Sequence, residues 1–206
     1  MAREYRYTDE SEEGLAARVK ALLLHVPDEV GAGHVYGRAA LLALLVLYGL
    51  KLAAMNIPSW EMASSLIHLP MVPIHEFGHI LFSPFGEFMH LLGGSLLQVV
   101  LPLVFGGIFL VKTRDPFAAA VMLWWSAVAT MDVAPYVYDA YQPQHVLLTG
   151  RTGETGAHDF IDVLGILGLL ARAQSIGYAV HRFGIAMLLV SFVWAAWILW
   201  RQYEKT

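Results

Sequence analysis

The sequence has no cysteine and little charge. Without a thiol, the chain can form neither a disulfide bond nor a thiolate metal site. Only 15% of its 206 residues are charged, whereas a soluble domain has about a quarter. The net charge is −4 and no basic run is present, so we expect no nucleic-acid partner.

The charged residues are concentrated near the N-terminus. Residues 1–38 hold twelve of the thirty charged side chains (13 Lys and Arg plus 17 Asp and Glu), whereas residues 88–111 and 183–200 hold none. A helix that crosses a bilayer needs roughly 20 apolar residues. Several such runs in a chain of this length leave too little polar surface for a soluble fold. We therefore expect an integral, multi-pass membrane protein in contact with the lipid bilayer, located in a bacterial cytoplasmic membrane.

The hydropathy pattern predicts an all-α fold with about five transmembrane helices and one shorter helix. The expected spans are residues 39–55, 60–82, 95–111, 117–141 and 180–200, and the shorter helix is expected at 158–171. Pro70 and Pro73 are expected to kink or break the second span, because proline removes a helical hydrogen bond. Gly93 and Gly94 are expected to lie in the loop that follows it.

We divide the chain into two parts. Residues 1–35 form a polar segment in which Leu15 and Val19 fall at helical spacing, and this predicts an amphipathic helix that lies on the membrane or on the rest of the protein. Residues 36–206 form the predicted transmembrane metal-hydrolase domain.

A cluster of ionisable residues interrupts the second apolar segment. His75 and His79 are four residues apart, so on a helix both imidazoles point from one face and can bind one metal ion. Glu76 lies about 100° around the same helix, near the metal but not bound to it. Two nitrogen ligands and a carboxylate base are what a zinc-bound water requires. Because ionisable groups in membrane segments are costly and mark functional sites, we predict a zinc cofactor with Glu76 as the catalytic base.

A catalytic zinc takes a third protein ligand and keeps one position open. The candidates are Asp132, Asp139, His158 and Asp159. Asp132 lies deep in the fourth apolar segment, either as a ligand or as a carboxylate that orients a ligand histidine. His158 could supply a nitrogen atom. Asp159 begins an apolar helix, where the helix dipole favours a carboxylate in any case.

The motif at residues 75–79 resembles that of the site-2 protease family, which comprises intramembrane zinc metalloproteases. In that family His-Glu-x-x-His lies on a membrane helix, and an Asp at the start of a later apolar helix is the third ligand. Asp159 occupies the matching position, and the segment 132–135 is a loose counterpart of the Asn- and Pro-containing break before it. The family has Gly after this Asp, whereas Phe160 follows here.

The resemblance implies that His75, His79 and Asp159 bind zinc and that the chain cleaves a membrane-embedded peptide. Two other functions remain open. The first is hydrolysis of an amide or ester in a membrane lipid by the same zinc chemistry, and the second is a non-catalytic role as a metal-bound membrane partner protein. In either hydrolase, the polar loop at residues 142–156 is the expected route for water.

Overall fold

The computed structural model describes residues 14–147 and 150–206, and within these ranges every regular element is helical. Residues 14–23 form the first helix. The elements that follow are α2 (Ala32–Ala53), η1 (Ile57–Ser59), η2 (Glu61–Ser64), α3 (His68–Phe82), η3 (Ser83–Phe85), α4 (Glu87–Ile108), η4 (Phe109–Thr113), α5 (Pro116–Asp139), α6 (Asp159–Ile166), η5 (Leu170–Arg172) and α7 (Ala173–Tyr203). The expectation of an all-α fold is confirmed.

Among the described residues, four helices are long and apolar enough to cross a membrane. They are α2, α4 with η4, α5, and α7 with η5, and they correspond to the first, third, fourth and last predicted spans. The other predicted span, residues 60–82, is divided between η2 and α3. Because α3 has only 15 residues, it is roughly 22 Å long at 1.5 Å per residue, which is short of the roughly 30 Å hydrocarbon core of a bilayer.

Neither proline breaks this segment, because helix α3 begins before Pro70 and continues through Pro73. Pro70 is tolerated because it lies in the first turn, where a backbone N–H has no helical partner in any case. Gly93 and Gly94 lie inside α4 and not in a loop. Their role is to let α3 approach α4, as described below.

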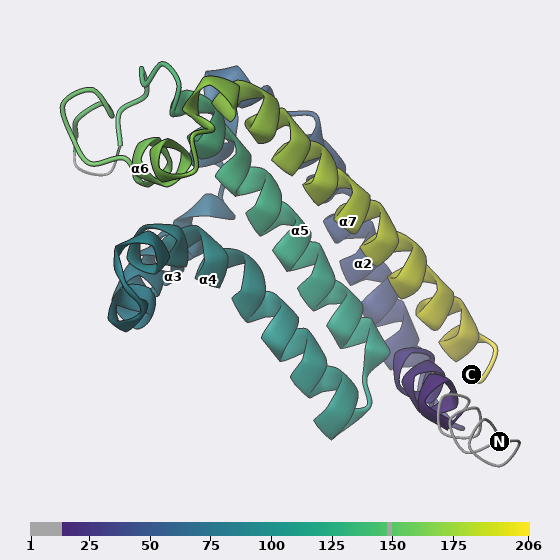
Figure 1. The fold of residues 1–206 in the computed structure, drawn as a ribbon. Coiled ribbons are helices and arrows are strands. Elements are labelled where there is room, and N and C mark those ends of the chain that lie inside the picture. The colour runs from purple at the N-terminus through teal and green to yellow at the C-terminus, as the bar shows by residue number, and fades with distance from the viewer. Residues whose placement is uncertain (1–13, 148–149) are drawn as a thin grey trace, which may run out of the picture.

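Helix α5 lies at the centre of the bundle, with α4 on one side and α7 on the other (Figure 1). In α5, 72% of the most apolar window is buried, against 28% or less in the other three long helices. Helix α2 packs against α7 and α5. The three outer helices therefore direct most of their surface away from the protein, as helices in contact with lipid do.

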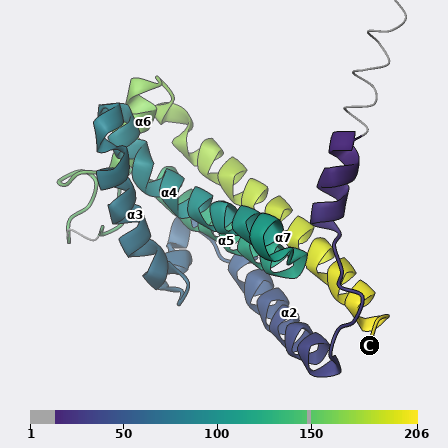
Figure 2. The ribbon, with the colours of Figure 1, turned by 90° about the horizontal axis from the view of Figure 1, so that it is seen from below.

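The short helix α3 lies at one end of this bundle, next to the start of α4 (Figures 1 and 2). Helix α6, which follows the loop after α5, contacts α4 at the same end. Residues that are far apart in the sequence, on α3 and at the start of α6, are therefore brought together over α4 and α5.

The helix at residues 14–23 belongs to the predicted N-terminal segment 1–35. Leu15 and Val19 are exposed on it, with 63% and 45% of their surface accessible. The Trp194 indole N–H donates a 2.8 Å hydrogen bond to the carbonyl of Leu23, which connects this helix to α7. Residues 1–13 of the predicted segment lie outside the described residues.

Candidate metal centre

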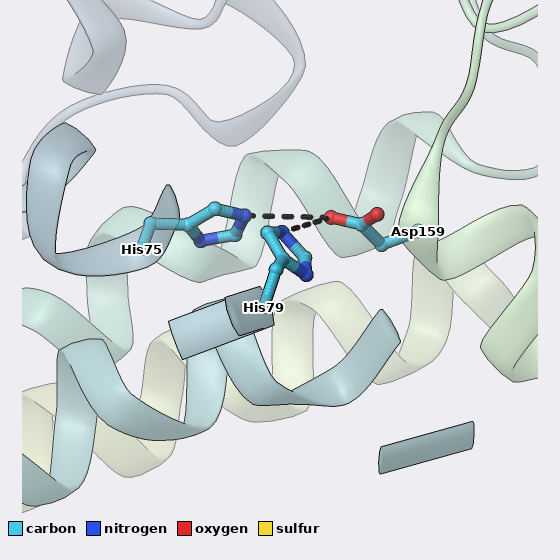
Figure 3. A group of neighbouring side chains, drawn as sticks. All are labelled: His75, His79 and Asp159. Carbon is cyan, nitrogen blue, oxygen red and sulfur yellow. Dashed lines mark hydrogen bonds and ion pairs between the residues drawn. The ribbon is translucent and has the colours of Figure 1, made fainter. Parts of the chain in front are cut away.

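His75 and His79 of α3 meet Asp159, the first residue of α6 (Figure 3). The Nε2 atoms of His75 and His79 lie 3.4 and 3.3 Å from the same Asp159 oxygen, Oδ2. One donor atom from each of the three side chains lies within 4.8 Å of the other two, so the group could hold a metal ion. The three side chains are 14–16% exposed, so the centre is largely buried.

Three glycines allow α3 and α4 to approach closely enough to form this centre. A Cβ atom on Gly78 would clash with the carbonyl oxygen of Gly93, so the two backbones are in direct contact. A Cβ atom on Gly94 would lie 2.6 and 2.7 Å from the Nε2 atoms of His75 and His79. Small residues permit close helix crossings in membranes, and here they also keep the space beside the two imidazoles free.

A buried hydrogen-bond chain determines which nitrogen of His75 faces the centre. The carboxylate of Asp132 can only accept, so the Gln98 side-chain N–H donates to Asp132 Oδ2 at 2.7 Å. The Gln98 amide oxygen is then left facing His75 Nδ1, at 3.3 Å. Because this oxygen can also only accept, Nδ1 of His75 carries the proton. Nε2 therefore presents its lone pair to the centre.

His68, at the start of α3, holds Asp132 from the other side. Its Nδ1 lies 2.9 and 3.0 Å from the two oxygens of Asp132. This hydrogen bond, against the opposing effect of burial, raises the pKa of His68 above its ordinary value. His68 and Gln98 thus contact the Asp132 carboxylate from two sides, and a carboxylate that only accepts gives the chain its direction.

His79 is oriented by the backbone of α4. Its Nδ1 lies 2.7 Å from the carbonyl oxygen of His90 and must donate to it, so that Nε2 again carries the lone pair. The His90 ring returns a hydrogen bond from Nδ1 to the carbonyl oxygen of His79, at 3.0 Å. That carbonyl lies in the last turn of α3, where helical partners are missing. Both histidines are thus anchored through Nδ1 and free at Nε2, which is the usual arrangement of metal-binding histidines.

Asp159 is held between the two imidazoles and Tyr136. The Tyr136 hydroxyl lies 3.1 Å from Oδ2 of Asp159. Burial opposes ionisation of the carboxyl. In the absence of a metal, the hydrogen bond and the charge that His75 and His79 provide when Nε2 also carries a proton, together with the Tyr136 hydroxyl, lower the pKa of Asp159 below its ordinary value. The carboxylate form, which is the form that binds metals, is therefore favoured.

Glu76, the predicted base, lies next to His75 on α3 and is exposed. It is not part of the three-residue group, which agrees with a position about 100° around the helix from His75. Because the side chain is exposed, its carboxylate is accessible from outside the protein.

The structure places the other candidate ligands elsewhere. His158 is 2% exposed, and its ring stacks on Tyr136 with centroids 4.3 Å apart. Its Nε2 lies 3.8 Å from Oδ2 of Asp139, so the imidazole is directed to Asp139 and not to the centre. Asp132 contacts His68 and reaches His75 only through Gln98. Among the described candidates, only Asp159 contacts both histidines of the motif.

Four residues near the centre did not stand out in the sequence, namely His68, His90, Gln98 and Tyr136. Gln98 carries a signal that could have identified it. It lies in the uncharged stretch 88–111, and burying an amide in such a segment costs free energy unless it is hydrogen-bonded. Tyr136 carries no such signal, because tyrosine is ordinary near the ends of membrane helices.

No family model, curated protein or solved structure matches the chain. The chemistry of the centre therefore has to be inferred from its own residues. Two imidazole nitrogens and one carboxylate oxygen converge on one point. This donor set is typical of catalytic zinc sites, which use three protein ligands and leave a fourth position for water or substrate.

Proposed function

We propose that the chain is a zinc-dependent intramembrane hydrolase, and that it acts as a metalloprotease on a membrane-embedded peptide. The observation that carries the proposal is the approach of two Nε2 atoms, from His75 and His79, to one oxygen of Asp159 at 3.4 and 3.3 Å. Two donors at ~2.0–2.1 Å from a tetrahedral zinc ion lie ~3.4 Å apart. The three side chains therefore suit a single zinc ion.

His75, His79 and Asp159 would hold the metal. When bound, zinc supplies a Lewis acid and lowers the pKa of a water molecule toward ~7. Glu76 would accept a proton from a water molecule at the open position and would later give it to the leaving amine. Gln98 and the carbonyl of His90 keep both Nε2 lone pairs directed at the centre throughout the cycle.

The four long apolar helices indicate that the protein lies in a lipid bilayer. We place α3 inside the membrane boundary without crossing it, at the end of the bundle that α6 and the loop after α5 cover. A peptide substrate is preferred over a lipid because the motif resembles that of the site-2 proteases. The bacterial cytoplasmic membrane stays a prediction from the sequence.

Substitution of Glu76 by Gln tests the proposal. The amide cannot accept the proton, so E76Q in nanodiscs should keep its zinc and lose cleavage of fluorogenic membrane peptides. The matched control is E87Q, which changes another exposed carboxylate, at the start of α4. This variant should keep both its zinc and its peptide cleavage.

Full cleavage by E76Q would contradict the mechanism. Hydrolysis of lipid amides or esters, with no peptide cleaved, would identify a lipid hydrolase. A zinc-bound wild type that is inactive on both substrate panels would identify a non-catalytic protein.

A further inference from the structure

Tyr136 connects the centre of the bundle to the start of α6. It lies one turn after Asp132 on α5, and its hydroxyl makes two hydrogen bonds to a single residue, Asp159. The hydroxyl donates to Oδ2 of Asp159 at 3.1 Å, and it accepts from the backbone N–H of Asp159 at 3.0 Å. A hydroxyl can donate once and accept twice, so both of its functions are used on the same residue.

The bond from the Asp159 backbone satisfies a need of α6 itself. The first N–H groups of a helix have no partner within the helix, and a side chain just before the helix usually accepts from one of them. Here the residue at that position is His158, and its side chain makes no such bond. The hydroxyl of Tyr136, which comes from another helix, takes this role and fixes where α6 begins.

The Tyr136 ring is itself held in place by other aromatic rings. His158 stacks on it with ring centroids 4.3 Å apart and planes at 29°. Phe160 and Trp60 meet it edge-on, at centroid distances of 5.4 and 6.2 Å. These contacts come from both sides of Asp159 and from the start of η2. These ring contacts therefore hold the Tyr136 hydroxyl in place beside Asp159.

We infer that Tyr136 is a positioning residue, which sets the ligand oxygen of Asp159 for the metal. This inference rests on the proposed zinc centre. Oδ2 is the oxygen that faces both imidazoles, and a carboxylate oxygen has about two lone-pair sites. The Tyr136 O–H occupies one site, so one remains to face the metal. Tyr136 thus fixes the position of Asp159 through the backbone and its orientation through the side chain.

The test compares Y136F with Y138F in the full chain. Tyr138 lies two residues further along α5 and packs edge-on against Tyr178, with centroids 5.5 Å apart, so Y138F removes a hydroxyl from the same helix but not from the centre. Zinc affinity is measured by competition with a chromophoric chelator. Loss of a group that orients a ligand typically weakens metal affinity ~10–100-fold. We expect this loss in Y136F and not in Y138F.

Two further measurements separate positioning from a general loss of stability. Cobalt absorbs visible light according to its ligand geometry, so the cobalt-loaded Y136F protein should show a shifted spectrum and the cobalt-loaded Y138F protein an unchanged one. If Y136F does not fold, 3-fluorotyrosine is placed at position 136 or at position 138 of the intact chain. The fluorine resonance at position 136 should move on addition of zinc and saturate at one equivalent, whereas that at position 138 should not.

These experiments distinguish a failure of the inferred role of Tyr136 from a failure of the proposed zinc centre. If wild type binds zinc, but Y136F binds it equally well with an unchanged cobalt spectrum, Tyr136 is not a positioning residue and the zinc centre stands. If the labelled protein binds zinc but the fluorine resonance at position 136 does not move, Tyr136 is again not a positioning residue and the zinc centre stands. If wild type binds neither zinc nor cobalt, the proposed function fails, and the role of Tyr136 fails with it.

Discussion

Asp132 accepts a 2.7 Å hydrogen bond from Gln98 between two largely apolar helices, α4 and α5. Because Asp132 can only accept, this single bond determines the direction of the Gln98 amide, and through it the position of the proton on His75. A residue without a direct contact to His75 thereby controls which nitrogen that histidine offers to a metal.

Substitution of Asp132 by Asn should weaken zinc binding without abolishing it. An Asn side chain can donate as well as accept, so Gln98 could turn over and the preference for a free Nε2 on His75 would be lost. The affinity should fall ~10–100-fold, as is typical for groups that orient a metal ligand. The measurement is zinc affinity by chelator competition.

The control for this substitution is D139N. Asp139 is also buried on the same helix, and its Oδ1 accepts from the backbone N–H of Gln144, which an Asn oxygen can also do. We expect D139N to bind zinc like wild type. Equal affinities for D132N and D139N would mean that the direction of the Gln98 amide does not matter.

The third ligand is tested by comparing D159N with H158A. Asp159 contacts both imidazoles, whereas His158 is turned toward Asp139. Replacing a carboxylate by a neutral amide removes a strong zinc ligand, so D159N should lose zinc during dialysis against a chelator at a concentration where H158A retains it. If D132N lost zinc while D159N kept it, the ligand would have to be assigned to α5.

The sequence predicted that His75 and His79 share one face of a helix, and the structure places both on α3. The spacing of His75 and His79 requires only that the segment is a helix, because residues four apart then share a face. The position of Asp159 did not follow from spacing. It was inferred from the resemblance to the site-2 proteases, and the structure places it against both histidines.

Other features could not be predicted from the sequence for physical reasons. The pairing of Gln98 with Asp132 depends on how α4 and α5 are rotated about their own axes. Apolar residues cover these helices nearly all round, so hydrophobicity does not indicate which face meets which neighbour. The segment 60–82 has the composition of a span, but composition alone does not reveal that its first residues form a short turn and leave α3 with 15 residues.

Whether the two motif histidines bind zinc can be tested by measuring the zinc content of the purified protein and its variants. Purified wild type should contain about one zinc ion per chain, and H75A or H79A should contain little, because one remaining imidazole and one carboxylate hold zinc weakly. The number of zinc ions per chain is measured by elemental analysis after gel filtration. H34A is the control, since His34 lies at the start of α2, outside the three-residue group. Full zinc occupancy in both H75A and H79A would show that the motif is a coincidence of sequence.

The steric prediction concerns Gly94, whose missing side chain leaves room for the centre. A Cβ atom there would lie 2.6 and 2.7 Å from the two Nε2 atoms that face the metal site, so G94A should push both imidazoles out of position and abolish zinc binding. G107A changes another glycine of α4 at a point where a Cβ atom meets nothing within 4 Å. Since alanine favours a helix over glycine by ~1 kcal/mol, G107A should fold at least as well as wild type and keep its zinc. The measurements are zinc content and thermal unfolding of both variants in the same detergent. A G94A protein that keeps full zinc would mean that α3 and α4 can separate at their crossing without disturbing the histidines, and the close packing at Gly78 and Gly93 would then not be needed for metal binding.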